Sequence, residues 1–354
     1  MRRPLRQAIR IRSLSCPFRV IRGCIFLSLG DSTVNYRTLG RTGYSVSEIG
    51  FGAWGIGGSM WQGSDDAESL RALHTAVDLG VNFIDTAYGY GDGHSEELIG
   101  RLLKERKEEI RVSTKIPPMD GHWPGRGNVP VRAVFPRRHI IACTERSLRK
   151  LGVDIINIQQ FHVWHDNWLS EGEWWETIEE LKQQGKIRYF GVSINDHEPD
   201  TALKLVASGK VNTVQVIHNI FDQSPEDELY PLCIEKNVGV IVRVPFDEGG
   251  LTGKITPDIT FPPGDWRNGY FRGDRKRQVF ERVEKLKPLL GEEAATLPEL
   301  ALRYILSFDA VSTVIAGVRK PDHARENCAV SDGGKLSPKL LKELKKHQWR
   351  RNFY

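Results

Sequence analysis

The sequence predicts an α/β protein, a (β/α)8 TIM barrel with an N-terminal β-hairpin and extra C-terminal helices. Short apolar segments alternate with amphipathic segments about eight times after residue 48. Strands separated by helices pair in parallel through right-handed crossovers, and eight such units in one chain match a (β/α)8 barrel. The rival, a doubly wound sheet, usually closes its first strand with G-x-G-x-x-G, and this chain lacks that motif.

Composition excludes several classes of protein. The chain has 354 residues, of which 40% are hydrophobic and 27% charged, so it can bury a core and wholesale disorder is excluded. No stretch approaches the ~18 uncharged apolar residues of a membrane-spanning helix. The five cysteines form no CxxC or CxxxxC pair, which argues against a disulfide scaffold and a cysteine-ligated metal. We therefore expect no metal site and no membrane partner.

The net charge of +5 is concentrated at the N-terminus. Residues 1–34 contain seven Arg and one acid, so the remaining chain has a charge of −1. We expect residues 1–34 to form a disordered basic extension and residues 35–354 to form the barrel domain. A transit-type targeting segment and a wrongly chosen start codon are the alternatives for the extension. The nearly neutral body implies no nucleic-acid partner, and we expect a cytoplasmic location.

The predicted elements follow local sequence signals. A hairpin is expected at 37–48. The first long helix begins at Ser64 with acidic residues in its first turn and ends before Gly80, and Ser95 is predicted to cap the next helix. Further helices are expected at 138–151, 173–184, 199–207, 226–236, 275–289 and 297–307 and near residue 322. Strands are expected at 49–53, 81–84, 110–114, 154–158, 187–192, 213–217, 238–242 and 311–315.

Polar residues stand at the C-terminal ends of the predicted strands. In a (β/α)8 barrel the catalytic groups lie at that end. In chain order the residues are Asp85 with Tyr90, Lys115, His162, Ser193 with Asn195, Gln215 and Arg243. Each alone has an ordinary structural explanation, such as a turn cap, a solvated strand end, a packed aromatic or a satisfied core histidine. The convergence of four titratable groups of different types favours a functional site.

These residue types suit proton delivery to a carbonyl oxygen. A free phenol has a pKa near ~10, and a neighbouring Lys ammonium is expected to lower it. A carboxylate keeps the ammonium charged and aimed, and an imidazole can orient the substrate oxygen and stabilise developing charge. No side chain supplies hydride, so the hydride must come from a cofactor.

The chain resembles the aldo-keto reductase superfamily at residues 85–91, which read Asp85-Thr86-Ala87-Tyr88-Gly89-Tyr90-Gly91 and are followed by His94-Ser95-Glu96-Glu97. The resemblance runs from residue 36 to residue 327, nearly all of the chain beyond the extension. Further matching motifs are Tyr36-Arg37-Thr38-Leu39-Gly40, Ser113-Thr114-Lys115, Leu151-Gly152-Val153-Asp154 with His162, Gly185-Lys186-Ile187-Arg188, Gly191-Val192-Ser193, Leu251-Thr252-Gly253-Lys254 and Ala316-Gly317.

The resemblance implies roles for particular residues. Tyr90 would be the general acid–base, Lys115 and Asp85 would tune it, and His162 would orient the carbonyl. The implied cofactor is NADP(H), bound across the barrel mouth, with Ser193, Asn195 and Gln215 on the nicotinamide carboxamide. The pyrophosphate would lie under a loop containing Pro245, Phe246, Asp247, Gly249, Leu251 and Lys254. The adenosine end would be held by Gly317, Arg319, His323, Glu326 and Asn327.

Two positions depart from the family pattern. Ile194 separates Ser193 from Asn195 where many members have Ser-Asn, which puts the second amide contact in doubt. Arg243 stands where an aromatic usually stacks on the nicotinamide. A guanidinium plane can also stack, and its charge should favour the neutral, reduced ring; a salt bridge to Asp247 or Glu248 is the alternative. Arg319 supplies charge for a 2′-phosphate, which favours NADP(H) over NAD(H).

The substrate is constrained only in class. Trp54, Trp123 and Trp164 are expected to line the pocket and to suit an apolar, aromatic or sugar-like carbonyl. Residues 341–354 are expected to fold over the barrel as a closing segment. The predicted function is therefore NADPH-dependent reduction of an aldehyde or ketone to the alcohol. The alternatives are an NADPH-binding regulatory subunit with little turnover and a non-redox lyase or glycosidase, which would need two catalytic carboxylates.

Overall fold

A computed structural model describes residues 34–353 of the chain. The predicted extension lies outside the described residues except for Val34. That residue is buried, and its backbone N–H donates to the Leu79 carbonyl. Val34 therefore belongs with the barrel domain.

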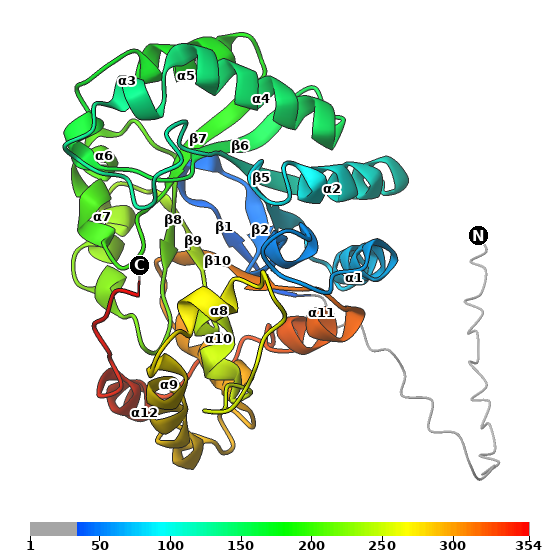
Figure 1. Ribbon diagram of the computed structural model, residues 1–354, viewed down its shortest axis with the longest axis vertical. Coiled ribbons are helices and arrows are strands. Elements are labelled where there is room, and N and C mark those ends of the chain that lie inside the picture. Colours follow the sequence, from blue (N-terminus) through cyan, green and yellow to red (C-terminus); the bar gives the residue numbers. More distant parts are fainter. Residues whose placement is uncertain (1–33, 354) are drawn as a thin grey trace, which may run out of the picture. The chain divides into compact units, whose positions relative to one another are not determined.

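Eight parallel strands close into a barrel, which confirms the predicted fold class (Figure 1). The order around the barrel is β10-β3-β4-β5-β6-β7-β8-β9, so neighbours in the chain are neighbours in the barrel. The strands are β3 (Ile49–Gly52), β4 (Phe83–Asp85), β5 (Arg111–Ile116), β6 (Ile156–Phe161), β7 (Ile187–Ser193), β8 (Thr213–Ile217), β9 (Gly239–Arg243) and β10 (Val311–Gly317).

The predicted hairpin closes the N-terminal end of the barrel. Strands β1 (Tyr36–Thr38) and β2 (Ser45–Ser47) pair antiparallel, with a 3-10 turn at Gly40–Thr42 between them. Leu39 and Val46 of this hairpin are fully buried against the apolar floor of the barrel. An L side chain at Gly40 would place its Cβ 2.2 Å from the backbone nitrogen of Gly239, so a glycine is required where the hairpin touches β9.

Helices cover the outside of the barrel (Figure 1). The longer ones are α1 (Asp66–Asp78), α2 (His94–Glu105), α4 (Arg137–Leu151), α5 (Trp174–Gln183), α9 (Arg275–Glu284) and α10 (Leu297–Leu306). Shorter ones are α3 (Val131–Val134), α6 (Leu203–Ser208), α7 (Leu229–Glu235), α8 (Arg267–Tyr270), α11 (Pro321–Cys328) and α12 (Pro338–Lys345). Helix α12 follows the last barrel helix, in agreement with the predicted extra C-terminal helices.

The predicted cap of α2 is wrong. The N-cap residue is Gly93, whose φ of 87° places it in the left-handed region. Ser95 lies inside the first turn, where its hydroxyl donates to the Ala53 carbonyl and bonds the Thr86 hydroxyl. The serine therefore ties α2 to the loops after β3 and β4 because its side chain points inward. Asp65 caps α1 through a 2.8 Å bond from the Glu68 N–H.

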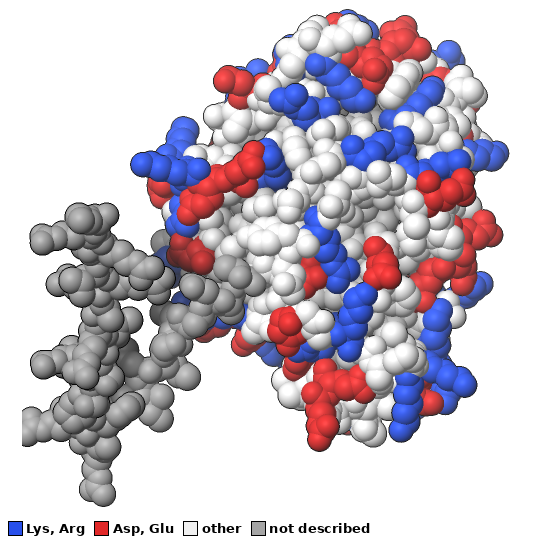
Figure 2. All heavy atoms as spheres, turned by 180° about the vertical axis from the view of Figure 1, so that it is seen from behind, with Lys and Arg blue, Asp and Glu red and all other residues white. Residues whose placement is uncertain are grey.

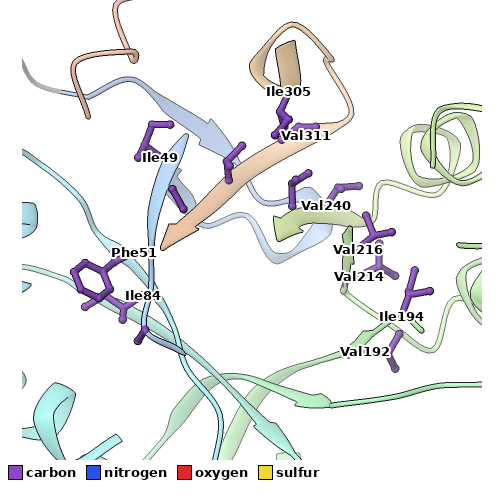
Figure 3. Packing of buried hydrophobic residues seen from close by; sticks show 14 of the residues in the cluster. Ile49, Phe51, Ile84, Val192, Ile194, Val214, Val216, Val240, Ile305 and Val311 are labelled. Carbon is purple, nitrogen blue, oxygen red and sulfur yellow. The ribbon is translucent and has the colours of Figure 1, made fainter. Parts of the chain in front are cut away.

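The hydrophobic core lies mainly between the barrel and its helices. Figure 3 shows members of it on several strands, including Phe51 of β3 and Val214 of β8, with Ile305 of α10 near Val311. Basic and acidic side chains are interspersed on the face shown in Figure 2. Among the described residues, no helix is both long enough and apolar enough to cross a membrane.

Candidate active site

The barrel interior is layered by the two-residue period of its strands. Phe83, Ile158, Ile241 and Ile315 form an apolar layer above the hairpin. Residues two positions further along a strand face the same interior one layer higher. That next layer contains Asp85 and Gln160, which follow Phe83 and Ile158 by two positions. The interior is therefore apolar at its floor and polar toward the C-terminal ends of the strands.

Lys115 and Asp85 form a buried ion pair in the polar layer. Nζ of Lys115 lies 2.5 Å from Oδ2 of Asp85 and 2.7 Å from the Thr86 carbonyl. The Lys115 side chain has no exposed surface. Burial raises the pKa of Asp85 and lowers the pKa of Lys115, and their mutual attraction opposes both changes. Each group stabilises the charged form of the other, and removal of either one would leave its partner buried without a counter-charge.

Tyr90 approaches this pair from the loop that follows β4. Its hydroxyl lies 3.5 Å from Nζ of Lys115. The loop is held by close backbone packing, since a Cβ at Gly57 would lie 2.9 Å from the carbonyl carbon of Tyr90 and one at Gly91 would lie 2.0 Å from the Gly57 oxygen. Gly91 also has a φ of 68°. The close approach at these two glycines therefore fixes the position of the Tyr90 loop.

The pKa of Tyr90 is raised, not lowered as predicted. Burial is the main cause, and the negative charge of Asp85 adds to it. The prediction expected the ammonium of Lys115 to lower the pKa of the phenol and placed Asp85 beside the lysine, but it took no account of burial or of the effect of the carboxylate on the phenol. Arg243 exerts an opposing effect. Tyr90 is therefore a protonated phenol at neutral pH, which is the form that can donate a proton.

His162 lies beside Tyr90 at the end of β6. The two rings are edge to face with centroids 5.7 Å apart. Burial lowers the pKa of His162 well below its ordinary value, and the charges of Lys115 and Arg243 lower it further. The imidazole is therefore neutral near pH 7. Its Nδ1 is buried and has no hydrogen-bond partner among the described residues.

The structure thus brings the four predicted residues together at one end of the barrel. It also adds Gln160, which the sequence analysis missed. Gln160 donates 2.6 Å to the Ser113 hydroxyl and 3.4 Å to Oδ1 of Asp85. Gln160 could have been found from its position two residues after Ile158, which places both side chains on the same face of the strand.

Of the three residues expected at the nicotinamide, Gln215 and Ser193 remain compatible with that role. Gln215 donates 2.7 Å to Oδ1 of Asp85, while its Oε1 is buried without a partner among the described residues. Ser193 is buried at the end of β7. Asn195 differs, because both atoms of its amide bond the backbone of Gly125. Ile194 stands between Ser193 and Asn195, and the side chain of Asn195 lies against the loop that follows β5.

Arg243 is also held by protein groups. Its guanidinium is paired with Asp196 and donates 2.9 Å to the Ile194 carbonyl. The ion-pair partner is therefore Asp196 and not Asp247 or Glu248, the two acids considered from the sequence. Asp196 follows β7 and Arg243 ends β9, so the pair links two strands that lie on either side of β8.

The predicted pyrophosphate loop is held from the C-terminus. It includes the irregular 3-10 segment Asp247–Thr252, with Pro245, Phe246, Gly249, Leu251 and Lys254 in or beside it. Asp247 is buried, accepts 2.9 Å from the Tyr270 hydroxyl and pairs with Arg351. Burial raises the pKa of Glu248 to about 8, and repulsion from Asp247 and Asp196 adds to the rise. Glu248 lies inside the predicted loop and Arg351 inside the predicted closing segment, but neither was singled out as a site residue.

Of the predicted closing segment 341–354, residues 341–345 belong to α12, and residues 349–353 lie beside this loop. The Trp349 N–H donates 2.8 Å to the Phe221 carbonyl. The Phe353 carbonyl accepts 2.9 Å from Arg275. Asn352 lines a small cavity together with His162 and Trp123.

The residues expected at the adenosine end lie together after β10. Gly317 is exposed at the strand end, and Glu326 is exposed on α11. Arg319 reaches back to donate 2.7 Å to the Gln62 carbonyl. Burial lowers the pKa of His323. Asn327 is buried, and its Nδ2 has no partner among the described residues.

The three tryptophans expected to line the pocket separate. Trp54 stacks on Tyr90 with centroids 6.0 Å apart, and Trp123 is edge to face with His162 at 4.4 Å. Trp164 is fully buried among Trp168 and Trp174. The prediction for Trp164 is therefore wrong, because the chain turns after His162 and sends this side chain into the outer core.

The chain matches a family model described as "Aldo/keto reductase family" over residues 48–348. It is 32% identical over 310 residues to an NADH-specific methylglyoxal reductase of Escherichia coli, with 82% of this chain and 91% of that protein covered. It is 29% identical over 319 residues to a probable voltage-gated potassium channel subunit beta of Arabidopsis thaliana, with 84% and 92% covered.

A solved structure shares the fold. The holo form of the aldo-keto reductase AKR11C1 from Bacillus halodurans matches with a TM-score of 0.69 and 28% sequence identity. The match covers 89% of this chain and 96% of that one. The similarity therefore extends over the barrel as a whole.

Proposed function

This chain belongs to the aldo/keto reductase family of oxidoreductases, and on that premise we propose that it reduces an aldehyde or ketone to the alcohol with Tyr90 as proton donor. The observation that carries the proposal is the position of the Tyr90 hydroxyl, 3.5 Å from Lys115 and beside His162. A buried, protonated phenol at the open end of a barrel is suited to giving a proton to a substrate oxygen.

The residues present fit a nicotinamide dinucleotide. Oε1 of Gln215 and Nδ2 of Asn327 are buried polar atoms without partners among the described residues, and such atoms are costly unless a ligand or water satisfies them. Gln215 and Ser193 would hold the nicotinamide end, and Arg319 and Asn327 the adenosine end. When bound, the cofactor would supply the hydride that no side chain can provide.

The chain's own residues do the remaining work. His162, as a neutral imidazole, orients the substrate oxygen toward Tyr90 and stabilises the negative charge that develops on it. Tyr90 passes its proton to that oxygen. Lys115 then stabilises the negative charge left on the phenol from 3.5 Å away, while Asp85 keeps Lys115 charged and aimed.

We favour NADP(H) over NAD(H), since Arg319 lies at the adenosine end and can meet a 2′-phosphate. The E. coli relative is named as NADH-specific, so the comparison of kcat/KM with NADPH and NADH is the direct test. The substrate class is an apolar, aromatic or sugar-like carbonyl, because Trp54 and Trp123 border Tyr90 and His162.

The experiment is consumption of NADPH or NADH with a panel of aldehydes, ketones and sugars. Tyr90→Phe is expected to lower kcat by about 10²–10⁴-fold, with little change in the Kd of the cofactor. Trp54→Phe is the matched control, since it keeps a ring beside Tyr90 and should retain the proton-transfer step. Full activity of Tyr90→Phe would contradict the assignment.

The alternative, a cofactor-binding regulatory subunit with little turnover, predicts a different result. Such a protein would bind the dinucleotide with ordinary affinity but would turn over no member of the panel. The resemblance to a probable channel beta subunit keeps this alternative under test. The complete set of Asp85, Tyr90, Lys115 and His162 favours the enzyme.

A further inference from the structure

Asn195 makes a paired contact with a loop 70 residues away in the chain. Its Oδ1 accepts 2.9 Å from the Gly125 N–H, and its Nδ2 donates 2.9 Å to the Gly125 carbonyl. The second hydrogen of the amide points to Glu198, at 3.4 Å. A primary amide has two donor hydrogens, so both are engaged by protein groups. This amide therefore has no hydrogen left to give to a cofactor.

Gly125 is fitted closely to its surroundings. A Cβ on this residue would lie 2.9 Å from the ring of Trp168 and 3.3 Å from Oδ1 of Asn195. The loop backbone therefore lies directly on the asparagine. Beyond this point the loop has other ties, because Trp168 donates to the Val129 carbonyl and Asn167 to the Gly127 carbonyl.

Trp123 stands two residues before this contact. It is 47% exposed, although its ring meets His162 at 4.4 Å. Between residues 119 and 124 the hydrogen bonds run within the loop or to Val134, and none reaches the barrel strands. The contact between Asn195 and Gly125 therefore supplies the hydrogen bonds nearest to Trp123 that join this loop to a residue after a barrel strand. A cavity beside it is lined by Trp123, Pro124, His162 and Asn195.

We propose that Asn195 is a positioning residue that holds the Trp123 wall of the substrate pocket in place beside His162, and that it is not a ligand of the cofactor. The proposal rests on the proposed function, because a substrate wall has meaning only if His162 meets a carbonyl. In the sequence, Ile194 separates Asn195 from Ser193, and the amide of Asn195 bonds the loop at Gly125.

The test compares three single variants of the full chain and the double variant Asn195→Ala/Gly125→Ala. Asn195→Ala removes the tie from the barrel side, and Gly125→Ala disturbs it from the loop side while leaving the asparagine intact. Asn167→Ala is the control, because it removes a tie further from Trp123. The readouts are KM and kcat for the best carbonyl of the panel, the Kd of NADPH by fluorescence, and hydrogen exchange of the Gly125 amide.

We expect Asn195→Ala and Gly125→Ala each to raise the carbonyl KM about tenfold and to leave the Kd of NADPH nearly unchanged. The double variant should be little worse than either single one, because both break one contact. Asn195→Ala should also expose the Gly125 amide to rapid exchange. Asn167→Ala should change the KM much less.

A higher Kd for NADPH in Asn195→Ala but not in Gly125→Ala would overturn the proposal, because it would show that the asparagine contacts the cofactor. Unchanged exchange of the Gly125 amide in Asn195→Ala would overturn it as well. If wild-type protein reduces no carbonyl, the proposed function fails and the substrate role assigned to Trp123 fails with it. The exchange measurement still reports separately whether Asn195 holds the loop.

Discussion

The barrel interior and the barrel rim hold their polar groups in different ways. In the interior, Lys115 pairs with Asp85 on the neighbouring strand, and Gln160 donates to Ser113, also one strand away. At the rim, the partners come from distant loops, as with Asn195 and Gly125 or with Asp247 and Arg351. The contacts between neighbouring strands follow from strand register, whereas the rim contacts depend on how separate segments fold over the mouth.

Backbone conformation shows the same difference. Val244, Asp247 and Glu248 at the rim have positive φ values of 50–56°, which non-glycine residues adopt at a cost of about 1–3 kcal/mol each. Such conformations persist only where surrounding contacts enforce them, and Arg351 and Tyr270 supply contacts to Asp247. Damage to the interior should therefore affect the whole fold, and damage to the rim should remain local.

The largest expected effect is that of Lys115→Met. The substitution leaves the Asp85 carboxylate buried without its cation, which should cost about 3–5 kcal/mol of unfolding free energy as well as turnover. Urea unfolding measures the stability. The double variant with Asp85→Asn should recover much of the stability but not the turnover, since no buried charge remains. If Lys115→Met alone were as stable as the wild-type protein, the Asp85–Lys115 pair would not be ionised.

Arg351→Leu tests the rim. Loss of the charge-assisted bond to Asp247 should weaken docking of residues 349–353 by about 1–3 kcal/mol. Hydrogen exchange of the Trp349 amide, which donates to the Phe221 carbonyl, should become faster while amides in the barrel strands stay protected. Arg350→Leu is the control, because that side chain is 78% exposed and surface pairs contribute little. If hydrogen exchange became equally fast at the amides of the barrel strands, the proposed difference between interior and rim would be wrong.

Glu248→Gln gives a smaller, pH-dependent effect. The folded-state pKa of about 8 lies above the ordinary value of 4.5, so the folded protein binds a proton that the unfolded chain releases. This group therefore stabilises the fold at low pH, and the stabilisation is lost as pH rises from 4.5 to 8. The decline in Tm between pH 5.5 and 8.5 should be smaller in Glu248→Gln than in wild type. The exposed Glu292→Gln should retain the wild-type decline.

The smallest expected effect concerns Arg243. If this cation lies beside the nicotinamide, it favours the neutral reduced ring over the cationic oxidised ring, but its pairing with Asp196 reduces the effect. Arg243→Leu should lower the ratio of NADPH to NADP⁺ affinity by about two- to fivefold, measured as Kd by fluorescence. Asp196→Asn should shift the ratio the other way by exposing the guanidinium charge. If the ratio of NADPH to NADP⁺ affinity were unchanged in both variants, Arg243 would not lie beside the nicotinamide.

Much of the fold and of the central site could be predicted from local patterns. The alternation of apolar and amphipathic segments predicted the barrel, and polar residues at strand ends predicted the positions of Asp85 and Lys115. Gln160 was missed although it obeys the same two-residue period. The prediction for Trp164 failed because sequence distance from His162 does not say which way a turn sends its next side chain.

The sequence by itself determined the order of the strands and the residues that face the barrel interior, because side-chain alternation and right-handed crossovers are local properties of the chain. Only the tertiary structure decided that Tyr90 is a buried, protonated phenol, that Asn195 holds Gly125 and that Arg351 reaches Asp247. These outcomes depend on burial and on contacts between segments up to 104 residues apart. No local pattern encodes such contacts, since their energy arises only when the whole chain has closed around the site.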